Sequence, residues 1–322
     1  MKLEAIITLL GEDWTNFGAL VRECLQSDIR LLNSVNDTLL SNTGKRMRPM
    51  LTLLMARALG GCNKESLLFA AASEMIHNAT LFHDDVVDGS SLRRGKPTLS
   101  SIVGPSAAVL IGDFWLSRAV NMLIDAPHQS DAIVLFSSAL SHLAEGEMLQ
   151  MQKVSDNDTE EADYLQIIYC KTASLFESAC RLGAVSVDAA PGQIESAGRF
   201  GAALGRAFQI RDDIFDYQQG EIGKPIGIDL KEQKITLPLI GAMRNAPEKE
   251  DSIREMVRGI PEHPEYCVQI HDFVLDNGGI EYASARLDDF IDEAISALDA
   301  FPASPEKDML AELARFNAVR NK

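Results

Sequence analysis

Apolar residues recur at intervals of three and four along almost the whole chain, and this helical period restricts the fold most. The first stripe predicts one helix and consists of Phe17, Leu20, Val21, Cys24, Leu25, Ile29, Leu32, Val35 and Leu39. Further helices are predicted from Pro49 to Leu59 and over about 64–88, 105–125, 130–153, 160–188, 192–219, 236–245, 249–259, 264–277, 280–300 and 304–320. No alternating run is long enough for a sheet. The chain is therefore predicted to be all-α, a single large helical bundle forming one domain over residues 1–322.

Composition narrows the functional classes. The chain has 30 basic and 47 acidic residues, so its formal net charge of −17 argues against a general nucleic-acid or anionic-membrane binder. Its five cysteines are odd in number and form no CxxC pair, which predicts a reducing, cytoplasmic location rather than a disulfide framework or zinc site. The N-terminus is too short and acidic for a signal peptide, and no run approaches the ~18 apolar residues of a membrane span.

The strongest local signal is LFHDDVVDGSSLRRGKPT, residues 81–98. Asp84 and Asp88 are four residues apart, so on a helix they share a face, with Asp85 at its edge. Carboxylates this close repel one another unless a cation or protons intervene, and hard oxygen ligands suit Mg²⁺. The following cations, among them Arg93 and Arg94, would suit the other side of a metal-bridged diphosphate.

A second cluster occurs in FQIRDDIFDY, residues 208–217. Asp212 and Asp216 again share a helical face, with Asp213 beside them. Lys224 and Lys234 lie in the loop that follows. Two such clusters on separate antiparallel helices could face one another across a cavity and hold several metal ions.

The same DDxxD pattern appears a third time, at Asp288, Asp289 and Asp292. No cationic loop follows it, and the apolar stripe of this segment leaves the aspartates on the polar side. We interpret it as a solvated helix face, which shows that the bare pattern is weak evidence. The cationic loops distinguish the other two copies.

Three further features of the sequence are considered as anion-binding groups. Lys45 and Arg48 lie in GKRMRP between two predicted helices, where they suggest an anion pocket or simply a solvated basic loop. His77 lies two turns before Asp84 on roughly the same face, although a lone histidine is more often structural. Lys171-Thr172 interrupts an apolar helix, so the lysine either reaches solvent or meets an anion in the cavity.

The order and spacing of six segments resemble those of the trans-isoprenyl diphosphate synthases, or polyprenyl synthetases. The segments are GKRMRP, LFHDDVVDGSSLRRGKPT, GDFWLSRA, Lys171-Thr172, GRAFQIRDDIFDY and GKPIGIDLKEQKITLPL, which together span residues 44–239. One departure is Gln233, where the family often has glycine. The resemblance implies an isoprenoid synthase-like bundle around a central cavity and, commonly for this family, a homodimer.

The resemblance also implies roles for the residues. Mg²⁺ would be held by Asp84, Asp85, Asp88, Asp212, Asp213 and Asp216. An allylic diphosphate would be neutralised by Arg93, Lys171, Lys224 and Lys234. Isopentenyl diphosphate would bind at Lys45, Arg48, His77 and Arg94. Thr172 and Gln209 would be polar supports near the allylic cation. The residues expected to be catalytic are Asp84, Asp85, Asp88, Arg93, Lys171 and Asp212, and the cysteines are expected to take no part.

Product length is predicted from the helix before the first cluster. In the family, a large aromatic residue at the Ala79 position stops the chain at short products. Ala79 is small and Thr80 follows it, so the product should pass, although Met75 and Ile76 narrow the path and Phe136 could form a floor from a facing helix. We predict an all-trans product of about six to ten isoprene units, of the kind used for quinone side chains. The alternatives are a short-chain farnesyl or geranylgeranyl diphosphate synthase, and an Ala79 that is small only because a neighbouring helix is close.

Three other classes of protein compete with this interpretation. A terpene cyclase binds one diphosphate and would not need the GKRMRP pocket. A non-catalytic partner subunit would be expected to have lost aspartates or pocket cations, whereas all are present here. A helical acidic binder of divalent cations does not explain the paired cationic loops. We expect no membrane span, and at most a peripheral membrane contact for product release.

Overall fold

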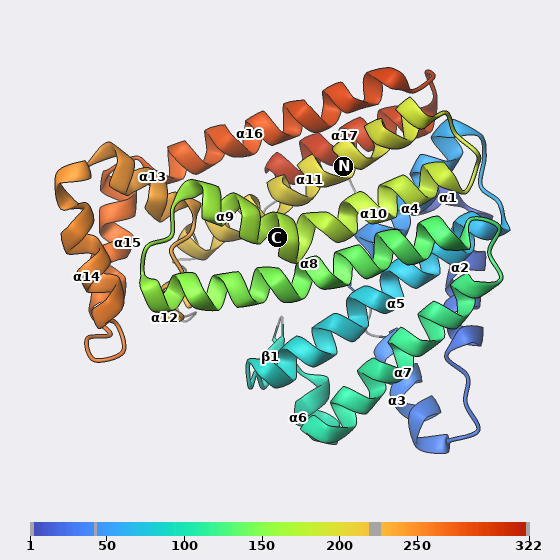
Figure 1. Ribbon diagram of the computed structural model, residues 1–322, viewed down its shortest axis with the longest axis horizontal. Helices are drawn as coiled ribbons and strands as arrows, with labels where there is room; N and C mark the ends of the chain where they lie inside the picture. The colour runs from blue at the N-terminus through green and yellow to red at the C-terminus, as the bar shows by residue number, and fades with distance from the viewer. Residues whose placement is uncertain (1–2, 42–43, 94, 219–226, 320–322) are drawn as a thin grey trace. The chain divides into compact units, whose positions relative to one another are not determined.

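The computed structural model describes residues 3–41, 44–93, 95–218 and 227–319, and almost all of its regular structure is helical (Figure 1). This confirms the predicted all-α fold. The α-helices are α1 (Leu3–Leu10), α2 (Glu12–Cys24), α3 (Arg30–Ser41), α4 (Met47–Leu59), α5 (Lys64–Val87), α6 (Leu99–Val103), α7 (Pro105–Ile124), α8 (Gln129–Asp156), α9 (Glu161–Ile168), α10 (Ser174–Val185), α11 (Pro191–Gln218), α12 (Ile228–Lys231), α13 (Leu237–Asn245), α14 (Glu250–Gly259), α15 (Tyr266–Asp276), α16 (Gly279–Ala297) and α17 (Pro305–Val319).

Two compact units make up the chain. The first unit contains Met1–Ser137, Ser178–Gly198 and Ala300–Leu310, and the second contains Ser138–Glu177, Arg199–Asp299 and Ala311–Lys322. Four of the five borders fall inside helices α8, α10, α11 and α17, and the fifth lies in a 3₁₀ turn at Leu298–Ala300. The assignment of residues 1–322 to a single domain stays a prediction.

The first apolar stripe is divided between two helices, which corrects the prediction of one helix. Helix α2 ends at Cys24 and α3 begins at Arg30. In the connection, the Ser27 N–H donates to Asn33 Oδ1 at 3.0 Å, and the Asn36 side chain donates to the Leu25 carbonyl at 2.9 Å. These side chains offer the backbone an alternative to helical hydrogen bonds, so the helix stops although the apolar period continues.

A two-stranded antiparallel ribbon is the other departure from the predicted elements. Strands β1 (Leu92–Arg93) and β2 (Lys96–Pro97) pair Leu92 with Pro97 and Arg93 with Lys96. Gly95 has φ +74°, a conformation that glycine adopts without steric cost. A ribbon this short depends on its turn rather than on alternating hydrophobicity, so the apolar pattern did not predict it.

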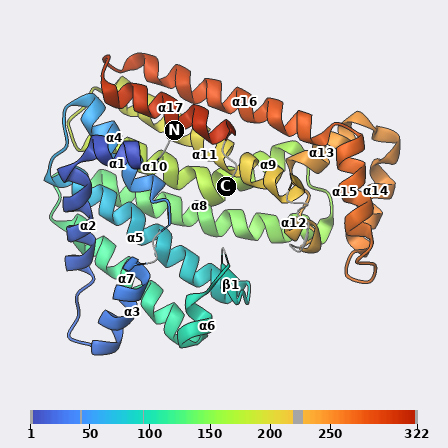
Figure 2. The same ribbon diagram turned by 180° about the vertical axis from the view of Figure 1, so that it is seen from behind.

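Helix α5 is the core of the first unit and packs against α2, α4 and α7 (Figures 1 and 2). Asn63 caps its N-terminus, because the Asn63 side chain accepts from the Ser66 N–H and the Ser66 hydroxyl accepts from the Asn63 N–H. Near its C-terminal end, Phe82 packs edge-on against Trp115 of α7. This packing fixes the last turns of α5, which carry the first aspartate cluster.

In the second unit, a π-helical turn interrupts the predicted helix over 160–188. It covers Tyr169–Ala173, between α9 and α10, and therefore includes Lys171 and Thr172. Gly205 of α11 lies so close that a Cβ there would be 2.5 Å from the Ala173 Cα, and a Cβ on Gly146 of α8 would be 2.7 Å from the Cys170 Cβ. Glycine at both positions lets α8 and α11 approach the turn.

Helix α7 is long and apolar enough to cross a membrane by length and composition, with a mean hydropathy of 1.4. The sequence predicts no membrane span, although this helix has two charged residues, Asp113 and Arg118, in an otherwise largely apolar run. This is weak support for a membrane span, since core helices of soluble proteins have the same composition. The absence of a span stays a prediction.

Candidate active site

The first aspartate cluster lies at the C-terminal end of α5, in the first unit. Asp85 is buried, and its Oδ1 accepts a hydrogen bond from Nε of Arg93 at 2.8 Å. Asp84 is half-buried and Asp88, the C-cap of the helix, is exposed. The structure therefore brings Arg93 to the cluster as predicted, but as the partner of Asp85.

The basic GKRMRP segment begins α4, also in the first unit. Arg46, the N-cap, has φ +51°, and its guanidinium lies 5.6 Å from the centre of the Phe17 ring and 4.0 Å from a Glu74 carboxylate oxygen. Burial lowers the pKa of Arg46. The middle cation is thus directed into the core, whereas Lys45 and Arg48 on either side are half-buried.

His77, Arg94 and Lys224 were also predicted to bind a diphosphate. His77 is half-buried on α5, two turns before Asp84, as the helical spacing predicted. Arg94 and Lys224 lie outside the described residues, so their assignments stay predictions.

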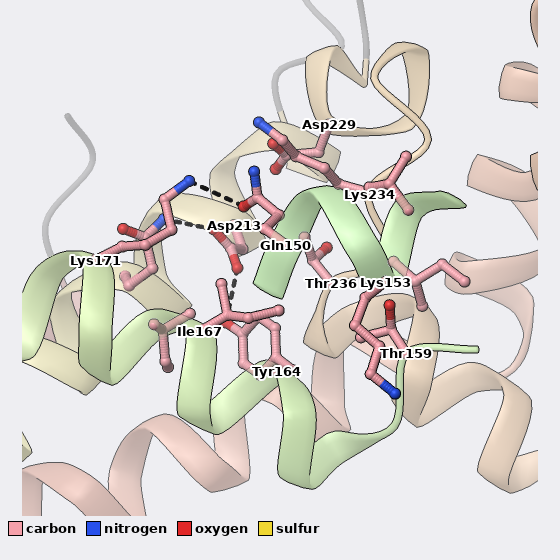
Figure 3. A pocket seen from close by; sticks show the side chains of 14 residues that line it. Gln150, Lys153, Thr159, Tyr164, Ile167, Lys171, Asp213, Asp229, Lys234 and Thr236 are labelled. Carbon is pink, nitrogen blue, oxygen red and sulfur yellow. Dashed lines mark hydrogen bonds between the residues drawn. The ribbon is translucent and has the colours of Figure 1, made fainter. Parts of the chain in front are cut away.

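The second aspartate cluster lies on α11, in the second unit, and its middle member is enclosed. Asp213 is 5% exposed; its Oδ2 accepts from the Tyr164 hydroxyl at 2.7 Å and its Oδ1 from Nε2 of Gln209 at 2.9 Å (Figure 3). Burial raises the pKa of Asp213 well above its usual range, and the carboxylate of Asp229 raises it further. Burial and Asp213 likewise raise the pKa of the Tyr164 hydroxyl.

Asp216 holds the loop that follows the cluster. Its two carboxylate oxygens accept hydrogen bonds from the N–H groups of Ile228 and Asp229, at 3.1 and 3.0 Å. Asp212 is half-buried on the same helical face. Asp229 was not predicted to belong to the site, yet burial together with Asp216 raises its pKa to about 6. Asp229 lies in the segment GKPIGIDLKEQKITLPL that carries the resemblance, but no role was predicted for it there.

Lys171 and Thr172 both have polar partners in the second unit. Nζ of Lys171 lies 2.7 Å from Oε1 of Glu147 and donates to Oε1 of Gln150 at 3.0 Å. The Thr172 hydroxyl donates to Oε1 of Gln209 at 3.0 Å. The predicted pair Thr172 and Gln209 is therefore in direct contact, whereas Glu147 and Gln150 were not predicted.

Lys234 is positioned by an unusual neighbour. Gln233 has φ +56°, and its side-chain amide donates to the carbonyls of Val257 and Arg258, both at 3.0 Å, at the end of α14. A left-handed conformation explains why glycine is frequent at this position, and the two hydrogen bonds offset the strain in this chain. Lys234 itself pairs with Glu232, which raises the lysine pKa against the lowering effect of burial.

These side chains surround a pocket of about 170 Å³ within the second unit (Figure 3). It is lined by Gln150, Lys153, Val154, Thr159, Tyr164, Ile167, Ile168, Lys171, Gln209, Asp213, Asp229, Lys234, Ile235 and Thr236. Four of these were predicted site residues: Lys171, Gln209, Asp213 and Lys234. The pocket thus combines cations, carboxylates and an apolar wall.

The third DDxxD copy on α16 differs from the other two. All three aspartates are exposed, and Asp289 pairs with Arg286 at 2.8 Å. Arg286 also bonds to Glu161, which ties α16 to α9. This arrangement agrees with the prediction of a solvated helix face.

The aspartates suit a divalent cation only together with a ligand. Among the described residues, no three histidine, cysteine or carboxylate side chains converge on a point that could hold a metal ion. Mg²⁺ is commonly bound by one or two carboxylates plus substrate phosphates, so a preformed cage is not required. Asp84 with Asp88, and Asp212 on α11, are donors of the right kind. The prediction that the two clusters face one another is untested.

The residues predicted to control product length are all buried in the first unit, namely Met75, Ile76, Ala79, Thr80 and Phe136. Ala79 shares a helical face with Ile76 and His83. His83 contacts α7, where its ring occupies the space that a Cβ on Gly112 would need. The burial of Ala79 is compatible both with a wall of the product tunnel and with close helix packing.

The fold and these motifs define an all-α prenyltransferase, and comparison with known proteins identifies its family. The family model described as polyprenyl synthetase matches residues 29–274. The chain is 38% identical to the octaprenyl diphosphate synthase of Escherichia coli over the full length of both proteins. It therefore belongs to the polyprenyl synthetase family.

Solved structures agree with this assignment. A decaprenyl diphosphate synthase from Rhodobacter capsulatus is 34% identical, with a TM-score of 0.93 and complete coverage of both chains. A polyprenyl synthase from Caulobacter crescentus, complexed with calcium and isoprenyl diphosphate, is 35% identical, with a TM-score of 0.89, and covers 100% of this chain and 98% of its own. The isoprenoid synthase-like fold implied by the resemblance is thereby confirmed.

Proposed function

We propose that this protein condenses isopentenyl diphosphate with an allylic diphosphate to make a medium-to-long-chain all-trans polyprenyl diphosphate. The observation that carries the proposal is the pocket of the second unit, where Lys171 and Lys234 lie with Gln209 and Asp213 in a member of the polyprenyl synthetase family. The relatives named for octaprenyl and decaprenyl products support the chain length.

The allylic substrate binds through its diphosphate. Lys171 and Lys234 neutralise it, and Arg93 and Lys224 assist. As the allylic C–O bond breaks, its electron pair goes to the departing diphosphate, whose growing charge the cations stabilise. The oxygens of Thr172 and Gln209 support the allylic cation, and the apolar wall excludes water.

Isopentenyl diphosphate binds at Lys45, Arg48, His77 and Arg94. Its double bond attacks the allylic cation, so that a C–C bond forms, and a proton then leaves to the departing diphosphate. The guanidinium of Arg48 suits a bidentate contact with phosphate, which lysine would not reproduce. Arg46, which lies between Lys45 and Arg48 in the segment, contacts Phe17 and Glu74.

The carboxylates of Asp84 and Asp88 in the first unit, and that of Asp212 in the second, are each suited to a divalent cation that completes its coordination with diphosphate oxygens. We propose Mg²⁺ as this ion, and the calcium in the Caulobacter crescentus complex supports a divalent site in the family. Mg²⁺ supplies Lewis-acid stabilisation of the leaving group.

We also propose a homodimer. Apolar side chains of α7 and the start of α8 are exposed, including Leu110, Val120, Ile124 and Val134. Exposed apolar side chains on two consecutive helices suit an interface between subunits. We propose a reducing cytoplasm as the location of the protein, because the five cysteines are odd in number and form no CxxC pair in the sequence. A peripheral membrane contact would release the product, and a quinone side chain is the proposed use.

The test is incorporation of labelled isopentenyl diphosphate with geranyl or farnesyl diphosphate as starter, with Mg²⁺ and with EDTA. We expect product only when starter and Mg²⁺ are both present. Cyclised hydrocarbon from the starter alone would instead indicate a terpene cyclase. Inactivity with every starter, restored only by a second polypeptide, would indicate a partner subunit.

A further inference from the structure

Tyr164 begins a chain of hydrogen bonds that ends at the π-helical turn. The Tyr164 hydroxyl donates to one oxygen of Asp213 at 2.7 Å, and Gln209 donates to the other at 2.9 Å. The remaining amide atom of Gln209, its Oε1, accepts from the Thr172 hydroxyl at 3.0 Å. Three elements, α9, α11 and the π-helical turn, are therefore joined by side chains inside the second unit. Figure 3 shows the first of these bonds, from Tyr164 to Asp213.

The direction of each bond follows from the chemistry of the groups. Both oxygens of Asp213 accept, one from the Tyr164 hydroxyl and the other from Nε2 of Gln209, so the Gln209 amide turns its NH₂ group toward Asp213. The Gln209 oxygen then faces Thr172 and determines where the hydroxyl hydrogen points. Loss of the Tyr164 hydroxyl would therefore affect the orientation of Thr172 through Asp213 and Gln209. No role was predicted for Tyr164 from the sequence.

The same bonds limit what Asp213 can do. Its side chain is 5% exposed, and both oxygens already accept a hydrogen bond from a protein donor. Binding a metal ion would require at least one of these contacts to be broken or shared. The side chain of Asp212, one residue earlier, is half-buried.

We propose that Tyr164 is a positioning residue for prenyl transfer, and that Asp213 links it to Gln209 and Thr172 instead of binding metal. This inference rests on the proposed function. Tyr164 touches no reacting atom; it holds the orientation of the polar groups beside Lys171 in the pocket. The alternative is that the bonds merely satisfy buried polar atoms, with no effect on the reaction.

The first experiment compares Tyr164→Phe with Tyr282→Phe. Tyr282 is a matched control because its hydroxyl also donates to a carboxylate, Glu161, at 2.6 Å in the same unit. We expect Tyr164→Phe to lower kcat by about tenfold, the effect of one lost positioning hydrogen bond, with the KM for isopentenyl diphosphate changed by less than about twofold. Tyr282→Phe should leave both constants unchanged. A folded Tyr164→Phe enzyme with wild-type kcat would overturn the positioning role.

The second experiment does not depend on activity. Binding of Mn²⁺ in the presence of inorganic diphosphate is measured from the electron paramagnetic resonance signal of free Mn²⁺. Asp213→Asn should change the Kd by less than about threefold, whereas Asp212→Asn should raise it by more than about tenfold. Equal weakening by the two substitutions would overturn the assignment of Asp213. Because the measurement requires no prenyl transfer, it remains decisive if the wild-type protein makes no prenyl product, a result that would refute the proposed function alone.

Discussion

The ammonium of Lys171 lies 2.7 Å from a carboxylate oxygen of Glu147, and both residues belong to the second unit. Gln150 accepts a further hydrogen bond from the same ammonium. The lysine proposed to neutralise the diphosphate is thus paired with a carboxylate, so the diphosphate must compete with Glu147 for it. The pair keeps Lys171 directed toward the pocket at the expense of some affinity for anions.

Replacement of Glu147 by glutamine should therefore tighten the binding of inorganic diphosphate. A partly exposed ion pair contributes up to about 1 kcal/mol, so the Kd measured by calorimetry in EDTA should fall by about twofold to fivefold. Glu160→Gln is the matched control, because Glu160 pairs with Arg254 elsewhere in the unit. A weaker complex in Glu147→Gln would mean that Glu147 supports the diphosphate instead of competing with it.

Substitutions in the first two aspartate clusters should lower kcat strongly, whereas substitutions in the third should not. Asp84→Ala or Asp212→Ala should lower kcat by about 10²- to 10³-fold with the fold retained, because the loss falls on stabilisation of the leaving group. Asp288 and Asp289, replaced together by alanine, should leave kcat within about twofold, since both are exposed and surface changes have small effects. Steady-state kinetics with circular dichroism would check this. Equal sensitivity of the third cluster would show that flanking cations do not distinguish functional copies.

Stability of the first unit should depend on the charge of His128. Its imidazole contacts Glu65 at 2.9 Å and Asp188 at 3.3 Å, and the hydrogen bond to Glu65 raises its pKa. A raised pKa means that the stabilisation is complete below about pH 6.5, the unfolded value, and is lost as pH rises through the higher folded pKa.

The melting temperature should accordingly fall by about 1 to 3 °C more between pH 6 and pH 8.5 in the wild type than in His128→Gln. Differential scanning calorimetry of the two proteins at both pH values would measure this difference. Parallel changes in the two proteins would show that His128 does not contribute to the pH dependence.

The sequence predicted most helices closely, because a long amphipathic helix is a local property. The predicted segment 64–88 corresponds to α5, and 105–125 to α7. The single helix predicted through Phe17 and Leu39 was wrong, because side chains of Asn33 and Asn36 compete for backbone groups in the connection. Apolar periodicity carries no information about such competition.

The site residues that the sequence predicted are mainly those that belong to a pattern of charged residues along the chain. Lys171, Asp213 and Lys234 line one pocket, and the roles that the resemblance implies for them stay predictions. Tyr164 and Glu147 were missed, since their importance arises from contacts with residues distant in sequence. The departure at Gln233 was recognised, but its meaning required the backbone angle of +56° and the two bonds to the end of α14.

Ala79→Tyr should shorten the product while turnover is retained, if Ala79 lines the tunnel. The side chain is fully buried, and its helical face is shared with His83, which packs against Gly112 of α7. Overpacking a well-filled interface costs about 1 to 3 kcal/mol, so a clash would instead appear as a lower melting temperature. Chromatography of the products and a thermal melt distinguish the two. An unchanged product distribution from a folded, active variant would contradict a tunnel at Ala79.

The length of the product made by the wild-type protein tests the central claim most directly. The protein is incubated with farnesyl diphosphate, excess labelled isopentenyl diphosphate and Mg²⁺, and the dephosphorylated products are separated by chain length. The account predicts an all-trans alcohol of about six to ten isoprene units, the length for which the wall of α5 below the aspartates provides room. Products that stop at three or four units would contradict it and identify a short-chain synthase.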